Sequence, residues 1–379
     1  MFLWFSARML KLKSSSPRAR NHALDAWRGL AALAVLGAHL SDSLATFYPD
    51  SPFRHGGGLE AFLLHGQIGV DIFFLISGYI VFLSALRFRA SKKRDIASFL
   101  SKRVIRIYAP YLPVAILLGL AYSVLPSISK AGEPRVVNWI KSLTLFPIAG
   151  DYSLSVAWTL SYEMFFYCIV ACSIAFAGSI KKLIVAAIPS LTVIAYFLLS
   201  GRYGVGGTSN PWELLSSPYN LEFFAGCVLA FAVFQASQNA ESKHLSGFPL
   251  GTWFPKALYF AAIILMLMPF QNGVVYRFLL LSLVALTISP LASASISRLR
   301  ICNILAALGL FSYSLYLVHN PLQSLLVRMS VWLGLPSLFS AVALVFIPVA
   351  CAFVYYISVE SKSLELIKLV PDGAKATAA

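Results

Sequence analysis

The stretch from Arg28 to His39 reads RGLAALAVLGAH, ten uncharged residues between an arginine and a histidine. The two residues are 11 positions apart, which on an α-helix at about 100° per residue is three turns plus about 20°. Their side chains would therefore share one helix face, about 16 Å apart along the axis. The apolar segment that holds them, 24–45, is long enough to cross about 30 Å of hydrocarbon. The stretch thus predicts a transmembrane helix that carries a cation near one surface and an imidazole roughly two-thirds of the way across.

The rest of the chain has the composition of a membrane protein. Of its 379 residues, 59% are hydrophobic and 12% charged, and the mean hydropathy is +0.77, unlike a soluble globular protein. Apolar runs long enough to cross a bilayer as helices recur along the sequence. We interpret ten of them as transmembrane helices, namely 24–45, 68–86, 105–125, 153–177, 183–200, 219–236, 254–270, 275–292, 302–327 and 335–358. The predicted fold is an all-α integral membrane protein with ten transmembrane helices.

The charge distribution orients this topology. The net charge of +15 would also suit a protein that binds nucleic acid. With the N-terminus inside, however, 22 of the 30 Lys and Arg residues fall on the cytoplasmic side and 7 on the other, as the positive-inside rule requires. We therefore expect both termini in the cytoplasm and no nucleic-acid partner. The predicted parts are a basic N-terminal tail (1–22), a membrane domain (23–360) and a C-terminal tail (361–379).

Cysteines and the N-terminus add little to this organisation. The five cysteines lie in or beside apolar segments and form no CxxC pair, so they predict neither a disulfide framework nor a metal site. In the first 20 residues the basic side chains follow the apolar stretch, the reverse of their order in a signal peptide.

Ionisable residues inside the predicted spans are the candidates for function, because each costs about 2.5 kcal/mol or more to place in lipid. Arg28 and His39 would mark a polar route along one helix. The alternatives are an arginine that snorkels to the surface and a histidine bonded to a neighbouring helix. Asp71 begins the second span at a depth that matches His39, where a carboxylate would fix the tautomer of the imidazole. The alternative role for Asp71 is to cap its own helix.

Two arginines and one glutamate extend this set toward the cytoplasmic side. Arg103 and Arg106 share a face of the third predicted helix at its inner boundary. Guanidinium groups there would bind phosphates through paired, charge-assisted hydrogen bonds, or would simply belong to a positive-inside loop. Glu163 lies about 15 Å into the fourth span. It either pairs with a buried cation, Arg28 or Arg106, or acts as a general acid or base.

Two candidates remain toward the outer side. His319 shares a helix face with Tyr316 and would either contact a substrate or only hydrogen-bond across the bundle. Glu222 lies early in the sixth span, where it could be a hydrated helix end.

Six segments that carry these residues resemble, in the same order, the motifs of the acyltransferase 3 family, membrane acyltransferases that modify bacterial surface and secreted polysaccharides. The segments are LDAWRGLAALAVLGAHL with its Arg-x10-His pattern, GVDIFFLISGYIV, KRVIRIYAPY, WTLSYEMFFY, EFFAGCVLAF and SYSLYLVHNPL. One such pattern would be weak support, but six in the family's order, on ten predicted helices, identify the chain as a member. The fourth segment is most similar to exopolysaccharide and O-antigen acetyltransferases.

The resemblance implies an O-acyltransferase of the bacterial cytoplasmic membrane. It would transfer an acyl group, most often acetyl, from cytoplasmic acetyl-CoA to a hydroxyl of a surface or secreted polysaccharide or its lipid-linked precursor. Acetyl-CoA is then a co-substrate, no cofactor is bound permanently, and the partners are the bilayer and a glycan acceptor. The implied roles are catalysis for His39, Asp71 and Glu163, binding of CoA for Arg28, Arg103 and Arg106, and contact with or support of the acceptor for Trp158, Tyr316, His319 and Glu222.

The sequence also departs from the family pattern. Lys102 stands where many members have an arginine, and no arginine shortly precedes Glu222. Some members carry a hydrolase-like extracytoplasmic domain after an extra helix, and we see no counterpart of it in this sequence. We therefore expect the membrane domain or a separate protein to complete the transfer. Two other classes fit the composition. One is a transporter or polysaccharide-export protein with a buried Arg/His/Glu path and no chemistry; the other is a structural scaffold, which the cost of buried polar groups disfavours.

Overall fold

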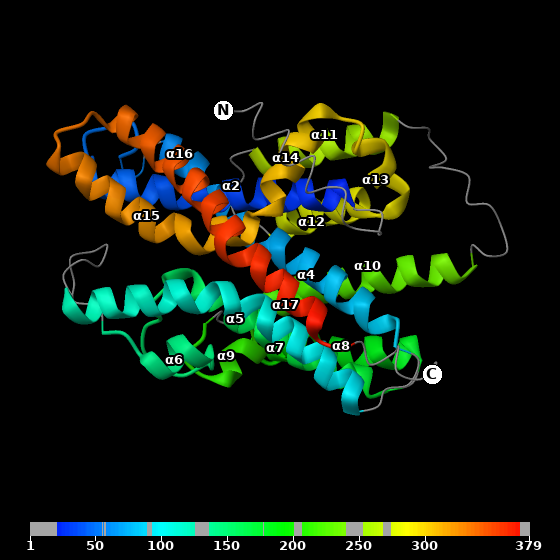
Figure 1. Ribbon diagram of the computed structural model, residues 1–379. Coiled ribbons are helices and arrows are strands. Elements are labelled where there is room, and N and C mark those ends of the chain that lie inside the picture. Colours follow the sequence, from blue (N-terminus) through cyan, green and yellow to red (C-terminus); the bar gives the residue numbers. More distant parts are fainter. Residues whose placement is uncertain are drawn as a thin grey trace.

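The computed structural model describes residues 21–54, 56, 58–88, 93–125, 136–176, 178–200, 207–239, 253–267 and 274–371. These residues form helices joined by short connections (Figure 1), with an isolated bridge between Val137 and Asp151. The first half contains α2 (His22–Phe47), α3 (Gly58–Leu64), α4 (Ile68–Leu86), α5 (Lys93–Val124), α6 (Trp139–Thr144), α7 (Trp158–Ile174), α8 (Ser179–Ser200) and α9 (Pro211–Leu215). The second half contains α10 (Tyr219–Asn239), α11 (Trp253–Leu267), α12 (Val274–Ile288), α13 (Pro290–Ile296), α14 (Arg300–Leu310), α15 (Ser312–Trp332), α16 (Ser337–Tyr355) and α17 (Ser361–Leu369).

The all-helical membrane class is confirmed. Within the described ranges, seven helical segments are long and apolar enough to cross a bilayer: His22–Phe47, Gly58–Leu86, Asp95–Val124, Ser155–Ile174, Ser179–Ser200, Tyr219–Ala236 and Ser337–Leu369. The predicted span 302–327 is instead a pair, α14 and α15, bent by 70°. The predicted spans 254–270 and 275–292 coincide with shorter apolar helices, Pro255–Ile264 and Leu279–Ile288. The total of ten spans and the cytoplasmic termini stay predictions.

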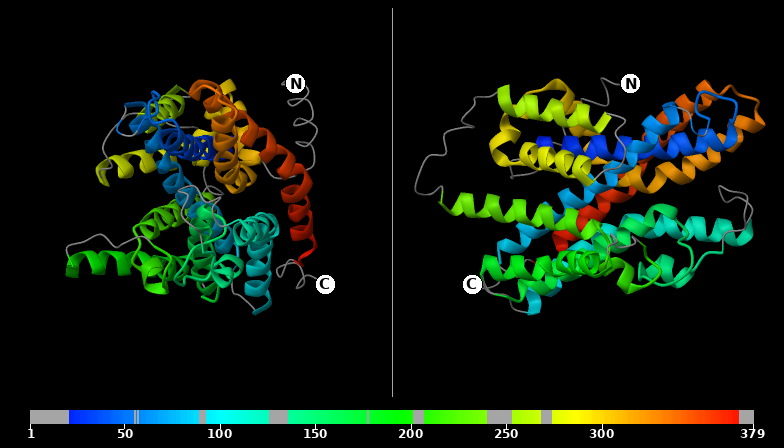
Figure 2. Two further views of the ribbon diagram at one scale, coloured as in Figure 1. Left: turned by 90° about the vertical axis from the view of Figure 1, so that its left-hand side faces the viewer. Right: turned by 180° about the vertical axis from the view of Figure 1, so that it is seen from behind.

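The helices lie in two layers. Figures 1 and 2 show one layer that holds α2 and α11–α15, and a second that holds α5–α9. Helix α4 crosses between the layers, and the C-terminal run of α16 and α17 crosses beside it and packs on α5. Because α4 contacts α2, α7 and α10, it lies at the centre of the protein, and its own side chains pack against both layers.

Glycines let the central helices approach to backbone distance. A Cβ atom at Gly309 of α14 would lie 1.9 Å from the carbonyl oxygen of Asp25 on α2, and one at Gly226 of α10 would lie 2.1 Å from the carbonyl oxygen of Leu75 on α4. Without a hydrophobic effect between helices in lipid, such close van der Waals contact is what holds them together. These contacts fix α2 and α4, the two helices that carry Arg28, His39 and Asp71.

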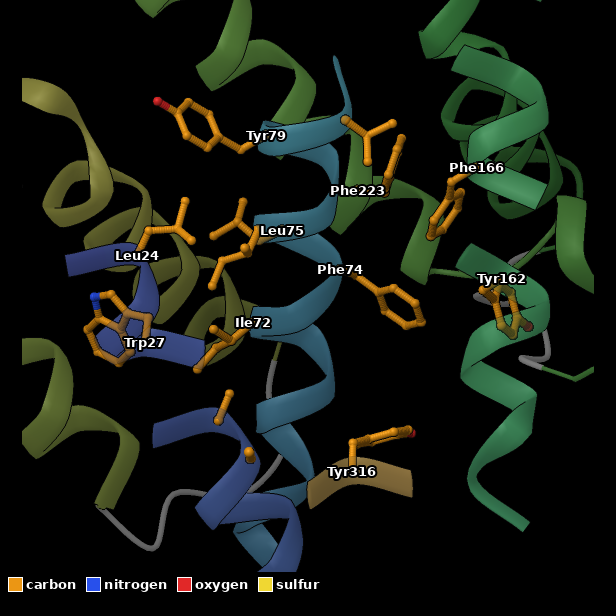
Figure 3. Close-up of a cluster of buried hydrophobic side chains, with 14 of the residues drawn as sticks. Leu24, Trp27, Ile72, Phe74, Leu75, Tyr79, Tyr162, Phe166, Phe223 and Tyr316 are labelled. Carbon is orange, nitrogen blue, oxygen red and sulfur yellow. The ribbon is translucent and has the colours of Figure 1, made fainter. Parts of the chain in front are cut away.

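The core is built on both faces of α4. On one face Ile72 and Leu75 lie toward Leu24 and Trp27 of α2, and on the other Phe74 lies toward α7 (Figure 3). The Trp27 indole N–H donates to the hydroxyl of Thr287, 2.9 Å away, so this buried polar atom is satisfied and ties α2 to α12. On the other side an aromatic group joins α4, α7 and α10, made of Phe74, Tyr162, Phe166, Tyr219 and Phe223.

A short π-helical turn links the last two helices. It spans Tyr356–Glu360 between α16 and α17, so that Ser337–Leu369 is one continuous helical segment that runs past residue 360. Single π-turns of this kind occur often at functional sites. Here the turn places Glu360, only 1% exposed, inside the protein.

Candidate active site

A cavity of about 810 Å³ lies between α2, α4, α5, α7 and α15. We call it the arginine cavity, because five basic side chains line it, Arg28, Arg87, Lys102, Arg103 and Arg106, together with the carboxylate of Glu163. Its lining begins at Val70 and continues along α4 to Phe88 beyond the end of that helix. Arg87 is one of the basic residues that the positive-inside count assigns to the cytoplasmic side, so we expect this end of the cavity to face the cytoplasm.

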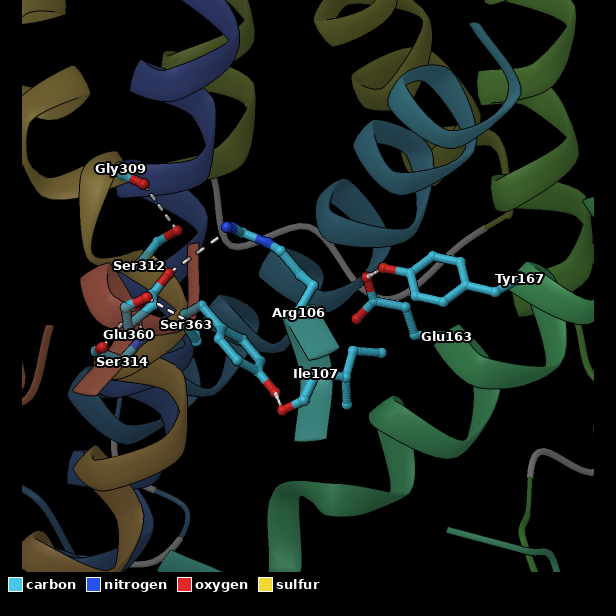
Figure 4. A network of polar contacts seen from close by, with 10 residues as sticks. Arg106, Ile107, Glu163, Tyr167, Gly309, Ser312, Ser314, Glu360 and Ser363 are labelled. Carbon is cyan, nitrogen blue, oxygen red and sulfur yellow. Dashed lines mark hydrogen bonds and ion pairs between the residues drawn. The ribbon is translucent and has the colours of Figure 1, made fainter. Parts of the chain in front are cut away.

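Two arginines of this cavity are held by different neighbours. Arg103 donates from Nη2 to the hydroxyl of Ser84 at 2.8 Å, and its guanidinium carbon lies 5.3 Å from the centre of the Phe99 ring. Arg106 lies with Nη2 3.7 Å from Oε1 of Glu360 (Figure 4). Both guanidinium groups therefore reach the cavity from α5 with part of their hydrogen-bonding capacity engaged.

Glu360 connects this cavity to the bend between α14 and α15. Its Oε2 accepts hydrogen bonds from the backbone N–H and the hydroxyl of Ser314, at 3.1 and 2.6 Å (Figure 4). Ser314 is in the first turn of α15, whose N–H groups have no partner within the helix. A carboxylate that caps this turn and pairs with Arg106 thus links the C-terminal helix to the cavity wall.

Glu163 lies with the arginines. It accepts a hydrogen bond from the phenol of Tyr167 (Figure 4) and another from the hydroxyl of Ser77 at 3.5 Å. The Tyr167 ring centre also lies 5.7 Å from the guanidinium carbon of Arg103. Of the two roles predicted for Glu163, these surroundings favour balancing buried cations over acting on His39, which lines a different cavity.

A second cavity of about 400 Å³ lies at the other end of α4, and His39 lines it. We call it the histidine cavity. Its polar lining consists of His39, Asp42, Gln67, Asp71 and Arg277, and its aromatic lining of Trp158, Tyr219 and Tyr316. Arg28 and His39 thus lie in two different cavities, as their 11-residue separation on one helix allows.

Of the two candidates on α15, His319 is buried and Tyr316 lines the cavity walls. The His319 ring centre lies 5.1 Å from that of His39 and 5.8 Å from that of Tyr316. Its Nδ1 contacts the carbonyl oxygen of Leu315 at 2.9 Å, one turn back on the same helix, and the side chain is 1% exposed. His319 therefore packs behind His39, while Tyr316 lines both cavities.

Asp71 has a partner that the sequence interpretation missed. Its Oδ1 lies 3.3 Å from Nη1 of Arg277 on α12, and its carboxyl group also contacts that of Glu222 on α10. In the sequence, Arg277 is one of the seven Lys and Arg residues that the positive-inside count places on the outer side. A charged residue four positions into a helix from Val274, with an apolar run after it, is the signal that would have marked it as a candidate. Glu222 is 8% exposed, so it is a member of this buried cluster and not a hydrated helix end.

The junction of the two cavities is held by hydrogen bonds from α15 to α7. The hydroxyl of Tyr316 lies 2.8 Å from that of Thr159 and 3.3 Å from the carbonyl oxygen of Val156. The ring of Phe73 packs edge to face on the Tyr316 ring, 6.0 Å between centres. Val70 lines both cavities beside them.

A connection outside the membrane-spanning segments positions the start of α7. Lys141, 3% exposed, donates from Nζ to the carbonyl oxygen of Gly150 at 2.9 Å and lies 4.6 Å from the ring centre of Tyr152. Burial lowers the pKa of its ammonium group, although Asp151 opposes the shift. The Tyr152 hydroxyl in turn lies 2.6 Å from that of Ser161. These contacts hold the segment that leads to Trp158 and Thr159, one in each cavity.

Comparison with known proteins supports one family. The model of a family described as an acyltransferase domain matches residues 21–358. No curated protein and no solved structure matches the chain. The matched range contains α2 to α16, the whole lining of the histidine cavity and all of the lining of the arginine cavity except Leu364 and Ile367 of α17. A match over nearly the whole chain, on a multi-helix membrane fold with the expected motifs at its two cavities, shows that the chain belongs to the acyltransferase 3 family.

Proposed function

We propose that this membrane acyltransferase moves an acetyl group from cytoplasmic acetyl-CoA to a hydroxyl of a surface or secreted polysaccharide, or of its lipid-linked precursor. The membrane is the bacterial cytoplasmic membrane. The observation that carries the proposal is the pair of cavities, one rich in arginine and one with a histidine, that meet at Val70 and Tyr316. Family membership supplies the reaction class.

The arginine cavity suits an acyl-CoA. CoA carries several phosphate groups, which guanidinium groups bind by paired, charge-assisted hydrogen bonds. Arg28, Arg103 and Arg106 supply these groups in the proposal, and the volume of about 810 Å³ lies within the range of small-molecule sites. Arg87, just beyond the end of α4, is 17 positions after Val70, about 25 Å along the helix axis. This length suits a co-substrate whose phosphates and thioester are far apart.

The histidine cavity suits an acceptor that bears hydroxyl groups. The carboxylates of Asp42 and Asp71 accept hydrogen bonds from hydroxyls, and the amide of Gln67 can both donate and accept. The rings of Trp158 and Tyr219, 5.4 Å apart between centres, offer an apolar surface beside these polar groups. A few convergent polar groups on an aromatic lining are typical of sites that fix a small ligand such as a sugar ring.

The proposed chemistry uses His39 as general base. It accepts the proton of the acceptor hydroxyl while that oxygen attacks the thioester carbonyl. The C–O bond of the new ester forms, the C–S bond of the thioester breaks, and the proton passes from the imidazolium to the leaving sulfur. The exchange consumes no net proton. Asp71 stabilises the imidazolium by its negative charge, and His319 supports the ring of His39 from behind.

The test uses membranes that contain the natural acceptor. Membranes of the source cell with the gene deleted, and of the same cell with wild-type or His39→Ala protein restored, are incubated with acetyl-CoA labelled in the acetyl group. We expect alkali-labile label on glycan material with the wild type alone. Absence of this label with correctly inserted wild-type protein would overturn the proposal, and a loss of polymer export on deletion would then favour the transport alternative.

A further inference from the structure

The two cavities share part of one wall. Val70 and Tyr316 line both of them, Phe73 and Thr159 line the arginine cavity, and Trp158 lines the histidine cavity. Residues 158 and 159 are consecutive on α7, so α7 changes from one cavity to the other within one step of the chain. The junction is therefore a thin layer of side chains between two chambers.

This layer is held firmly in place. Tyr316 is 7% exposed and Thr159 is also 7% exposed. The Thr159 hydroxyl donates to the carbonyl oxygen of Val156 at 3.0 Å, so its oxygen is left to accept from the Tyr316 hydroxyl, 2.8 Å away. The carbonyl oxygen of Val156 is also within 3.3 Å of the Tyr316 hydroxyl. Phe73 on α4 fixes the Tyr316 ring from the other side by its edge-to-face contact. A side chain held by two hydrogen-bonding partners and an aromatic contact keeps one rotamer, and a wall with fixed rotamers has a fixed volume.

The reacting carbon of the donor has to reach this layer. The basic groups of the arginine cavity include Arg87 at its far end, and the histidine cavity begins beyond Val70. A thioester can meet a hydroxyl that arrives beside His39 only where the two chambers adjoin. The acyl chain beyond the carbonyl then lies against Val70, Phe73 and Tyr316.

We propose that Val70, Phe73 and Tyr316 form the acyl-selecting wall of the enzyme, which admits an acetyl group and discriminates against longer acyl chains. This inference rests on the proposed function and adds the residues that choose the donor. Each methylene that does not fit a rigid apolar pocket lowers kcat/KM by about 10-fold or more. A butyryl group, two methylenes longer than acetyl, is therefore a sensitive probe of the wall.

The experiment is a competition between two labelled donors. Equal concentrations of acetyl-CoA labelled with tritium and butyryl-CoA labelled with carbon-14 are added to the gene-deleted membranes with each variant restored. The ratio of the two labels in the alkali-labile glycan fraction gives the ratio of kcat/KM directly. For the wild type we expect acetyl to be favoured by about 100-fold or more, because butyryl carries two additional methylenes.

Val70→Ala enlarges the wall and Val70→Ile narrows it. We expect Val70→Ala to raise the use of butyryl relative to acetyl by about 10-fold, and Val70→Ile to lower it further below the wild-type value. Phe73→Leu is a second enlargement from the same helix. The amount of Val70→Ala in the membrane and its thermal transition in detergent show whether this variant is inserted and folded. If it is not, Phe73→Leu tests the same wall in its place.

Val81→Ala is the matched control. Val81 is also on α4, 11 residues after Val70 and thus three turns along nearly the same face, about 16 Å away. It lines the arginine cavity alone. The same truncation at this position should leave the donor ratio at its wild-type value, because it lies away from the acyl group.

The outcomes separate this inference from the function on which it rests. If the wild type labels glycan with acetyl, and both enlarged variants keep the wild-type ratio, the acyl-selecting wall is overturned and the proposed function stands. An equal shift with Val81→Ala would also overturn the wall, since any loosening of α4 would then suffice. If the wild type transfers neither label, both proposals fail.

Discussion

The carboxylate of Asp71 on α4 and the guanidinium of Arg277 on α12 form an ion pair, 3.3 Å apart, beside the histidine cavity. The side chain of Asp71 is 4% exposed and that of Arg277 37% exposed. Because the carboxyl group of Glu222 also contacts Asp71, Arg277 is the cation that faces two acidic groups. It joins α12 to α4 and α10 at the edge of the site.

We expect the loss of this cation to destabilise the protein. Arg277→Met leaves Asp71 buried without its ion pair, at a cost of about 1–2 kcal/mol once the exposure of the arginine is allowed for. The double variant Asp71→Asn/Arg277→Met removes both charges and should be more stable than Arg277→Met alone. Thermal unfolding in detergent measures the series, with the exposed Arg300→Met as the control. Equal transition temperatures for Arg277→Met and Arg300→Met would contradict the pairing.

Arg103 is expected to act on donor binding. Arg103→Met removes a guanidinium from the arginine cavity, and the loss of one charge-assisted contact to a phosphate, about 1.5–3 kcal/mol, should raise KM for acetyl-CoA by about 10-fold or more. Steady-state rates in membranes at varied acetyl-CoA measure the change. Lys362→Met is the control, since Lys362 is an exposed cation of α17 that does not line the cavity. A fall in kcat with KM unchanged would argue against phosphate binding by Arg103.

His39 is expected to be required for the chemical step. His39→Gln keeps a polar side chain of similar size but removes the base, so we expect kcat to fall by about 10²–10⁴-fold, with acetyl-CoA binding retained. His65→Gln is the matched control on the connection before α4, since His65 lines neither cavity. Label transfer and a separate titration with acetyl-CoA give the two readouts. Transfer by His39→Gln at the wild-type rate would exclude His39 as the base.

The close approach of α4 and α10 leads to a stability prediction. Gly226→Ala would bring a Cβ atom to 2.1 Å from the carbonyl oxygen of Leu75, so the helices must separate. We expect a loss of about 1–3 kcal/mol from overpacking. At Gly37 on α2 the nearest atom to a new Cβ is a side-chain carbon of Leu63 at 3.6 Å, and Gly37→Ala should unfold at or above the wild-type temperature. Thermal transitions in detergent compare the two, and equal transitions would refute the contact.

Two substitutions of Glu360 should lower the unfolding temperature by different amounts. Glu360→Gln keeps an oxygen that can accept from Ser314 but loses the ion pair with Arg106. Glu360→Ala loses both and leaves two donors of Ser314 unpaired, at about 1–3 kcal/mol. We therefore expect Glu360→Ala to unfold at a lower temperature than Glu360→Gln. Equal unfolding temperatures would mean that the charge, which both variants remove, and not the helix cap is what α15 requires.

Much of the fold follows from helical periodicity and apolar length. The spacing of Arg28 and His39 placed them on one helix face, and they line separate cavities. Segment 302–327 was predicted as one span but is broken between α14 and α15. It bends next to Gly309, whose lack of a Cβ permits contact with the backbone of Asp25. Hydropathy does not reveal such a bend, because both halves are apolar.

The sequence predicts correctly that two site residues lie together when both are on the same face of one helix. Arg103 and Arg106 share a face of α5 and line one cavity. The partners of Asp71 were not predictable, because Arg277 and Glu222 reach it from helices far along the chain. Single-sequence patterns report neighbours three or four residues away, and they do not report which helices meet.

Glu360 has a consequence for how the protein is made. It lies 46 residues after Ser314, whose helix it caps, and a ribosome delivers the chain from the N-terminus. When α15 enters the membrane, its first turn and the nearby Arg106 have yet to receive that carboxylate. Only insertion of the last helix supplies it. The order of synthesis therefore postpones completion of the arginine cavity to the end of translation, so that a chain that stops before residue 360 lacks the carboxylate that Arg106 and the first turn of α15 share.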